Sequence, residues 1–270
     1  MIAPDKMFAG SMPEIYDHYL VPLIFESYAL DLAREVVNRA LRKVLETAAG
    51  TGVLSRAIAS MLPDKTQLVA TDLNQPMLDY AAQRLQGDHR VEWRQADALA
   101  LPFAEASFDA VVCQFGAMFF PDRVRGYREA RRVMRKTGRF LFSVWDRISE
   151  SVFADAVTES LVPFQPQNPP RFLARTPHGY CDADKIRGEL TEAGFRNVRI
   201  DFVQKISRAA SALDVAMAYC QGTPLRNEIA AIGGLSLEAA TQAATAELRR
   251  RFGDGPIEGP VKALVIEASA

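Results

Sequence analysis

The stretch that decides the fold is "VLETAAGTGVLS", residues 44–55. An apolar run ends in an acid, Glu46, and passes into a short loop of alanine, glycine and threonine before helical periodicity begins. Small residues in such a loop let a ligand lie close against the backbone. The stretch therefore predicts a strand, a nucleotide-binding turn and a helix, although at least two cofactor classes use such a turn.

Strand-like and helix-like patterns alternate on both sides of this turn, from about residue 41 to residue 145. The patterns predict strands at 43–48, 66–73, 91–97, 108–116 and 138–146, the last opened by a turn at 135–138, and helices at 53–62, 75–85 and 124–134. Apolar strands separated by helices indicate a parallel sheet covered on both faces. The fold class is therefore α/β, with a doubly wound core.

The remainder of the chain is more irregular but adds strands to the same sheet. A proline-rich connection at 163–177 precedes a helix that begins at 183 and ends at Gly194, followed by a strand at 197–207, and a mostly helical region at 209–251 precedes a strand at 259–269. We expect a mostly parallel, seven-stranded sheet within one domain, residues 1–270. Its core would comprise about 34–146, 186–206 and 256–270, with helical lid insertions from 1–33, 147–185 and 207–255.

Composition excludes several functional classes. The chain has 270 residues, 49% of them hydrophobic, and a formal net charge of -1, so no global field favours nucleic acid or an anionic membrane. No apolar stretch approaches the ~20 residues of a membrane span, and no secretory leader is visible. Three widely spaced cysteines form no C-x-x-C motif, which favours reduced thiols and a cytoplasmic protein.

The glycine turn does not complete a dinucleotide fingerprint. That fingerprint needs three glycines, and here Gly50 and Gly52 are followed by Ser55 at the third position. Glu46 lies at the carboxyl end of a strand, where doubly wound sheets bind ligands. A carboxylate there opposes a pyrophosphate and suits a ligand that carries an ammonium group.

The pattern resembles the first motif of the class I S-adenosylmethionine-dependent methyltransferases. In that family an acid is followed by alternating glycines, and this chain has Glu46, Ala48, Gly50 and Gly52 in those places. Ala48 departs from the usual glycine, and we expect it to be tolerated with a negative φ. The resemblance implies S-adenosyl-L-methionine as cofactor and methyl transfer as the activity.

Three further segments follow in register and extend the resemblance over about residues 40–146. It assigns the ribose hydroxyls to Asp72, the adenine to Asp97 and the backbone of Ala98, and the neighbourhood of the methyl donor to Gln114 and Phe115. It also places Leu73 and Met77 in the cofactor site. The N-terminal segment resembles small-molecule methyltransferases of type 11, which are related to the quinone-biosynthesis enzymes.

Residues outside the core motifs support weaker hypotheses. Tyr16 and Tyr19, three apart on one expected helical face, are suited to close over the sulfonium cation or simply to pack the helix. His178 and Tyr180 follow the proline-rich loop and are candidates for substrate contact, with a structural role as the alternative. His18 is expected at the surface.

Each main residue also has a purely structural reading. Glu46 and Asp72 could be solvated loop acids, Asp97 could cap a turn, and Cys113 within an apolar strand is expected in the core. The basic run at 123–136 suggests nucleic-acid binding, but its apolar residues keep helical spacing, which favours a solvated helix face.

The expected function is methyl transfer to a small, lipophilic or aromatic metabolite by in-line displacement, mainly through positioning. No residue declares itself as a general base, and no compact cluster of metal ligands is visible. Two alternatives remain open, an NAD(P)-dependent oxidoreductase and a non-catalytic S-adenosylmethionine-binding protein. The sequence leaves open the acceptor, the methylated atom (C, O or N) and whether the protein is a monomer or a homodimer.

Overall fold

The computed structural model describes residues 12–38 and 41–269 and contains a single seven-stranded sheet within that part of the chain. The strands are β1 (Lys43–Thr47), β2 (Gln67–Asp72), β3 (Val91–Gln95), β4 (Phe108–Gln114), β5 (Met134–Trp145), β6 (Asn197–Ala209) and β7 (Ile257–Ser269). Their order is β3-β2-β1-β4-β5-β7-β6; the pairs β1–β2, β1–β4, β2–β3 and β4–β5 are parallel, and β7 is antiparallel. The predicted doubly wound, mostly parallel α/β fold is confirmed.

The chain divides into two compact units. The sheet unit comprises residues 26–144, 181–203 and 263–270, and the helical unit comprises residues 1–25, 145–180 and 204–262. Strands β6 and β7 contribute residues to both units. The expected single domain with a lid stays a prediction, and its residues 1–11, 39–40 and 270 lie outside the described part of the chain.

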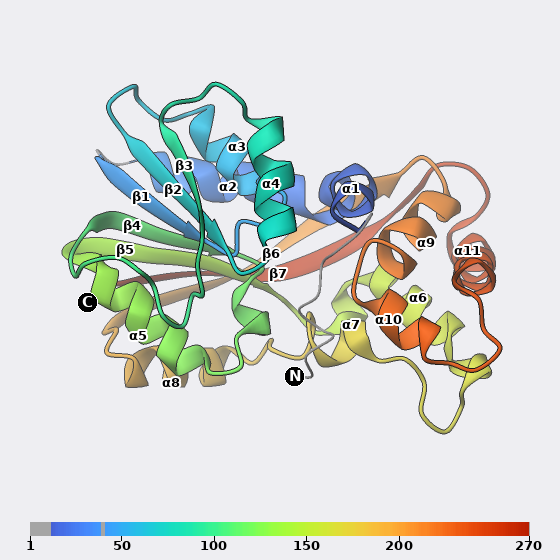
Figure 1. The fold of residues 1–270 in the computed structure, drawn as a ribbon. Coiled ribbons are helices and arrows are strands. Elements are labelled where there is room, and N and C mark those ends of the chain that lie inside the picture. Colours follow the sequence, from blue (N-terminus) through green and yellow to red (C-terminus); the bar gives the residue numbers. More distant parts are fainter. Residues whose placement is uncertain (1–11, 39–40, 270) are drawn as a thin grey trace. The chain divides into compact units, whose positions relative to one another are not determined.

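In the sheet unit, helices cover both faces of the sheet (Figure 1). They are α2 (Glu26–Val37), α3 (Val53–Ala59) and α4 (Gln75–Arg84) on one face, and α5 (Arg123–Val133) and α8 (Ala183–Glu192) on the other. A short 3₁₀ turn, η3 (Ala117–Phe119), connects β4 toward α5. Covering both faces explains why β1, β2 and β4 read as nearly continuous apolar runs.

Side-chain alternation along β5 separates the two cores of the sheet unit. Leu141 belongs to a buried cluster with Leu32 of α2 and Ile58 of α3. Phe140 and Phe142 project to the other face, where their rings lie 5.8 and 5.3 Å from the ring of Tyr127 in α5. Odd-numbered residues of this part of β5 therefore face α2, and even-numbered residues face α5.

Two expectations about local structure are wrong. The turn expected at 135–138 is absent, because β5 already begins at Met134 and pairs with Phe108 of β4, with a register shift between Phe108 and Ala110. Residues Tyr16–Phe25 form a π-helix, η2, in which hydrogen bonds join residues five apart. The expectation of one shared face assumed α-helical spacing; in the π-helix the Tyr16 ring stacks on Phe25, whereas the Tyr19 ring meets His18.

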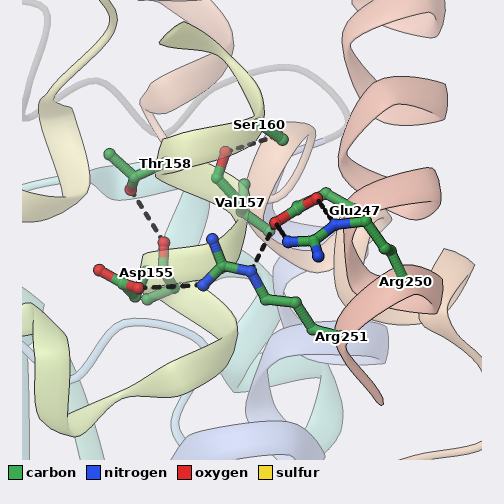
Figure 2. Close-up of polar contacts among 8 residues, drawn as sticks. Asp155, Val157, Thr158, Ser160, Glu247, Arg250 and Arg251 are labelled. Atoms are coloured by element: carbon green, nitrogen blue, oxygen red, sulfur yellow. Dashed lines mark hydrogen bonds and ion pairs between the residues drawn. The ribbon is translucent and has the colours of Figure 1, made fainter. Parts of the chain in front are cut away.

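The helical unit is built from short helices around buried alanines. They are α1 (Met12–Ile15), η2 (Tyr16–Phe25), η4 (Ile148–Glu150), α6 (Val152–Ser160), η5 (Val162–Phe164), α7 (Phe172–Arg175), α9 (Ala212–Cys220), α10 (Leu225–Ala230) and α11 (Leu237–Phe252). Ser211 and Ser236 accept backbone N–H groups at the starts of α9 and α11, as favoured N-caps do. Arg251 of α11 forms an ion pair with Asp155 of α6 and so joins the two helices (Figure 2). It forms another with Glu247, one turn earlier in α11.

The basic run that suggested nucleic acid is largely neutralised within the sheet unit. Side chains of α5 and of the following residues pair with carboxylates: Arg123 with Glu189, Arg128 with Glu192, Arg132 with Glu129 and Arg135 with Asp109. The apolar residues of α5 are buried against the sheet. The helix therefore has the amphipathic character that its spacing predicted.

Among the residues that the structure describes, no helix combines the length and the apolar character that crossing a bilayer requires.

Candidate functional site

The glycine turn lies at the carboxyl end of β1, between that strand and α3. Three of its residues have positive φ: Ala48 (55°), Gly50 (56°) and Gly52 (79°). The turn is closed by hydrogen bonds from Gly52 N–H to Ala49 O and from Ala49 N–H to Thr71 O, both 2.9 Å. This backbone turns sharply at three successive alternate residues, a conformation that small side chains permit.

Ala48 adopts the left-handed conformation, so the expectation of a negative φ is wrong. The Ala48 side chain has room because the residue opposite it, Gly116, has no side chain. A Cβ added at Gly116 would come within 2.4 Å of the Ala48 Cβ and 2.8 Å of the Cys113 Sγ. The methyl group of Ala48 thus occupies the space that a side chain at position 116 would need.

Gly52 is required both by its backbone angle and by its surroundings. A Cβ there would lie 3.0 Å from the Ala81 Cβ of α4 and 3.0 Å from the Trp93 ring of β3. Gly50 has open space, with only the Met77 Cε at 3.9 Å from such a Cβ. Gly52 therefore has two reasons to be glycine, whereas at Gly50 the positive φ favours glycine without requiring it, as Ala48 shows.

Glu46 is buried beneath the turn, with 1% of its surface exposed. Its Oε2 accepts a 2.6 Å hydrogen bond from the Ser55 hydroxyl. Burial raises the pKa of Glu46 to about 8, the Ser55 hydroxyl opposes the rise, Asp72 adds to it and Arg56 opposes it. The solvated-loop reading of this acid is wrong, and at neutral pH the ligand-free carboxyl is mostly protonated.

Asp72 ends β2 beside the turn and is also buried, with 7% of its surface exposed. Its Oδ2 accepts from Gly50 N–H at 2.9 Å, and its Oδ1 accepts from Asn74 N–H at 2.8 Å. Burial raises the pKa of Asp72, while these hydrogen bonds oppose the rise. The carboxylate therefore ties the ends of β1 and β2 together and is not a solvated loop acid.

The adenine candidates lie along the edge formed by β2 and the loop after β3. Asp97 is exposed, and its Oδ1 accepts from Leu99 N–H at 2.9 Å, so the side chain does cap a turn. Leu73 exposes 47% of its surface, which is unusual for a large apolar side chain at a strand end. Met77 is buried and Ala98 is half-buried, so only Leu73 presents a broad apolar surface to an incoming ring.

Gln114 and Phe115 end β4 next to the turn. Both are buried, and Phe115 has a φ of 51°, a strained value for a bulky residue. The Phe115 N–H donates to Ser143 O at 3.0 Å, and the ring meets Tyr28 of α2 edge to face at 5.5 Å. Strained backbone of this kind is typical of ligand sites, because the surrounding structure must hold it in place.

The remaining candidates belong to the helical unit. Tyr16 stacks on Phe25 at 5.2 Å, and Tyr19 meets the exposed His18 edge to face at 4.5 Å. Tyr180 is buried. His18 is at the surface, as predicted.

His178 is also buried, and its Nδ1 lies 2.7 Å from Asp146 O. Because a carbonyl oxygen only accepts, Nδ1 carries the proton and Nε2 is the acceptor of a neutral ring. Burial lowers the pKa of His178 to about 4. The ring therefore stays neutral at physiological pH.

A strand order of 3-2-1-4-5-7-6 with an acidic, glycine-containing turn after β1 is the class I methyltransferase fold. A family model described as "Methyltransferase domain" matches residues 45–142. A demethylmenaquinone methyltransferase of Clavibacter sepedonicus is 33% identical over 61% of this chain and 70% of its own length. The chain therefore belongs to the S-adenosylmethionine-dependent methyltransferases, whose cofactor is S-adenosylmethionine.

Other relatives agree with this assignment. A ubiquinone/menaquinone biosynthesis C-methyltransferase of Cronobacter sakazakii is 29% identical over 58% of this chain and 67% of its own length. The solved structure of a putative methyltransferase from an antibiotic biosynthesis pathway of Anabaena variabilis is 17% identical, covers 92% of this chain and 99% of its own, and has a TM-score of 0.61. At that identity the second likeness concerns the fold alone.

The residues at the turn fit this cofactor. The Thr51 hydroxyl is buried and has no hydrogen-bond partner among the described residues, which indicates a polar ligand atom beside it. Two buried carboxyls with raised pKa suit a ligand that brings positive charge, and exposed Leu73 suits a flat aromatic base. Glu46, Asp72 and the turn would hold the methionine and ribose parts, and Asp97 and Leu73 the adenine.

Sequence reasoning missed several residues of this site. Thr51 was passed over as a generic small loop residue, and Gly116 was not connected to Ala48 because 68 positions separate them. Ser55 entered only as a missing third glycine, although its hydroxyl binds Glu46. Among the described residues, no group of three or more His, Cys, Asp or Glu side chains has the geometry of a metal site.

Proposed function

We propose that the protein transfers the methyl group of S-adenosylmethionine to a small, lipophilic or aromatic acceptor. The sheet unit binds the donor, and the helical unit supplies the residues that bind the acceptor. The single observation that supports the acceptor class is a row of aromatic rings in the helical unit. Phe25 lies 5.2 Å from Tyr16 and 5.6 Å from Trp145, and the Trp145 ring lies 6.2 Å from His178.

Such a row favours a flat acceptor, because aromatic faces and edges attract one another beyond simple burial. The relatives from Clavibacter sepedonicus and Cronobacter sakazakii are named for quinone substrates, which are aromatic and lipophilic when reduced. We extend that class, and not a particular quinone, to this chain. His178 orients an acceptor hydroxyl in this proposal, because neutral Nε2 accepts a hydrogen bond.

The reaction needs little covalent help from the protein. The sulfonium methyl is already activated, the acceptor attacks it in line with the departing sulfur, and transfer neutralises the cation. The chain's contribution is to align the reactants and exclude water, which lowers the barrier by several kcal/mol, about 7–11 in favourable cases.

The direct test incubates the protein with methyl-labelled S-adenosylmethionine and a metabolite extract, followed by mass spectrometry of the labelled products. A reduced naphthoquinone is the first defined acceptor to compare with a small polar amine. A labelled aromatic or lipophilic product supports the proposal, and a labelled polar amine alone contradicts it. Calorimetry that shows cofactor binding, combined with no labelled product from any extract, would favour a non-catalytic cofactor-binding protein.

A further inference from the structure

A cavity lies within the sheet unit, apart from the glycine turn. Its volume is about 290 Å³, and it lies between α2 and the strands β5, β6 and β7. The helix contributes Tyr28, Asp31, Leu32 and Glu35, which are spaced i, i+3, i+4 and i+7 and therefore form one helical face. The strands contribute Ser143, Asp201, Val203 and Val265. None of the residues 46–52 lines it.

Ser143 supplies an unsatisfied polar group on the wall of this cavity. Its side chain is 2% exposed, and its hydroxyl has no hydrogen-bond partner among the residues that the structure describes. Leu141, two residues earlier on β5, packs with α2, and Arg139 donates to Val36 O of α2 at 3.0 Å. By strand alternation Ser143 faces the same side, toward the cavity. A buried hydroxyl in this position calls for a ligand atom that completes its bonding.

The charged residues of the cavity are mainly acidic. Three carboxylates line it, those of Asp31, Glu35 and Asp201, against one guanidinium, that of Arg34. Arg34 pairs with Asp31 at 3.0 Å. The neighbouring Arg199 is shared among Asp201 at 3.1 Å, Glu267 at 3.4 Å and Glu35 at 3.5 Å, and Glu267 also pairs with Arg139 at 3.6 Å. Two arginines therefore serve three carboxylates, which leaves this end of the cavity suited to an added positive charge.

The apolar part of the wall lies between these features, since Leu32, Val203 and Val265 also line the cavity. We propose that the cavity binds a small organic amine with a second hydrogen-bonding group. The ammonium group lies against Glu35 and Asp201, the apolar body lies along the aliphatic side chains, and the second polar group bonds the Ser143 hydroxyl. This site is separate from the site of the methyl acceptor.

The cavity is connected to the cofactor site through two contacts, both within the sheet unit. Tyr28, a cavity residue, meets the Phe115 ring edge to face, and Phe115 N–H donates to Ser143 O. Phe115 has strained backbone and lies at the end of β4 beside the glycine turn. An amine that packs against Tyr28 and bonds Ser143 also stabilises Phe115 and so raises the affinity for S-adenosylmethionine, and linkage requires the cofactor to raise the affinity for the amine equally.

The test compares three probes of similar size by protein-observed NMR and calorimetry. Tyramine has the ammonium and a hydroxyl, phenethylamine has only the ammonium, and 4-hydroxyphenylacetate reverses the charge. We expect tyramine to bind about tenfold more tightly than phenethylamine through one additional hydrogen bond, and the anion not to bind. Equal binding of all three probes, or no binding of either amine, would overturn the proposal.

Substitutions locate the binding. Ser143→Ala should reduce the affinity for tyramine to that for phenethylamine, and Asp201→Asn should weaken both amines, while Asp64→Asn, an exposed control outside the cavity, should change neither. Binding that survives both cavity substitutions would place the amine elsewhere.

The same titrations with S-adenosylmethionine present should show at least about a fivefold gain in amine affinity; no gain would overturn the coupling. Methylation of tyramine, detected by mass spectrometry, would identify the amine as an acceptor and contradict a separate site.

Discussion

Two glutamates, one in each unit, show how differently the units use their charged groups. Glu46 in the sheet unit is buried with Ser55 as its hydrogen-bond donor, and burial raises its pKa to about 8. Glu247 in the helical unit accepts from Arg250 and Arg251 (Figure 2), and the hydrogen bond from Arg250 contributes most to lowering its pKa to about 2. The protein therefore destabilises the ionised form of Glu46 and stabilises the ionised form of Glu247.

This difference separates a site that is incomplete without its ligand from a contact that is complete in itself. Around Glu46 the backbone is strained at Ala48 and Phe115, and the Thr51 hydroxyl lacks a partner among the described residues. Around Glu247 the charges neutralise one another at the surface. We therefore expect substitutions near Glu46 to change ligand binding strongly, and substitutions near Glu247 to change only stability, and weakly.

The largest effect is expected for Asp72→Ala. The substitution removes the acceptor of Gly50 N–H and Asn74 N–H as well as the proposed acceptor of the ribose hydroxyls. Hydrogen bonds to a charged group contribute about 2–3 kcal/mol, so the affinity for S-adenosylmethionine should fall about 30- to 150-fold in calorimetry. Asp72→Asn keeps the shape of the side chain, so its affinity for the cofactor should fall less. An unchanged affinity in Asp72→Ala would exclude this residue from the site.

The next effect concerns the pair Ala48 and Gly116. Gly116→Ala should destabilise the fold by about 2 kcal/mol because its methyl group overlaps that of Ala48. Its own φ of -103° is ordinary, so the effect is steric and not a matter of backbone angle. Thermal unfolding measures this cost, and cofactor calorimetry should show weaker binding in parallel.

The double variant Ala48→Gly/Gly116→Ala provides the control. Removing the methyl group at position 48 should restore part of both losses, although the contact with the Cys113 Sγ remains. Additive losses in the double variant would show that the two positions do not interact.

An effect of opposite sign for stability and binding is expected for Glu46→Gln. The folded-state pKa of about 8 exceeds the ordinary value of 4.5, so the native protein holds a proton that the unfolded chain has lost between these pH values. Stability of the ligand-free protein should therefore decline as pH rises from about 4.5 to about 8 and then level off. Glu46→Gln should remove this decline and raise the melting temperature most above pH 8.

Cofactor binding should respond in the reverse direction. A cationic ligand favours ionised Glu46, so the ratio of cofactor affinities, native over Glu46→Gln, should rise with pH and level off about one unit above the pKa of about 8. Since a group one unit below its pKa is about one-tenth ionised, the rise from pH 7 should be up to about tenfold. A ratio that does not change with pH would exclude Glu46 from contact with the positive charge.

The sheet unit could be predicted from the sequence because its signals are local. Apolar runs of strand length and helical spacing between them fixed the fold class, and Glu46, Asp72 and Asp97 occur at fixed positions relative to those runs. The prediction of a turn at 135–138 was wrong because Gly138 suggested a break in the strand. In the structure β5 includes Gly138, and its pairing with β4 shifts register between Phe108 and Ala110.

Long-range consequences could not be predicted. The room for the Ala48 methyl group depends on the missing side chain at Gly116, and the raised pKa of Glu46 depends on how deeply the turn buries it. In the helical unit, the π-helix at Tyr16–Phe25 has no signature in spacing, and Pro22 within it suggested no particular helix type. Contacts between distant residues decide these features, and one sequence contains no direct record of them.

The smallest effect is expected at the ion pairs of Arg251. Its side chain is 29% exposed and bridges Asp155 and Glu247, and solvent screens both interactions. A double-mutant cycle on Arg251→Met and Asp155→Asn, measured by denaturant unfolding, should give a coupling of about 0.2–1 kcal/mol.

Because the pKa of Glu247 is lowered, its contribution to stability is present above about pH 4.5 and is lost as the pH falls toward 2, the reverse of Glu46. The affinity for the cofactor should stay unchanged in Arg251→Met and Asp155→Asn. A loss comparable to that of Asp72→Ala would make these ion pairs part of the donor site, and the distinction between the two glutamates would then not hold.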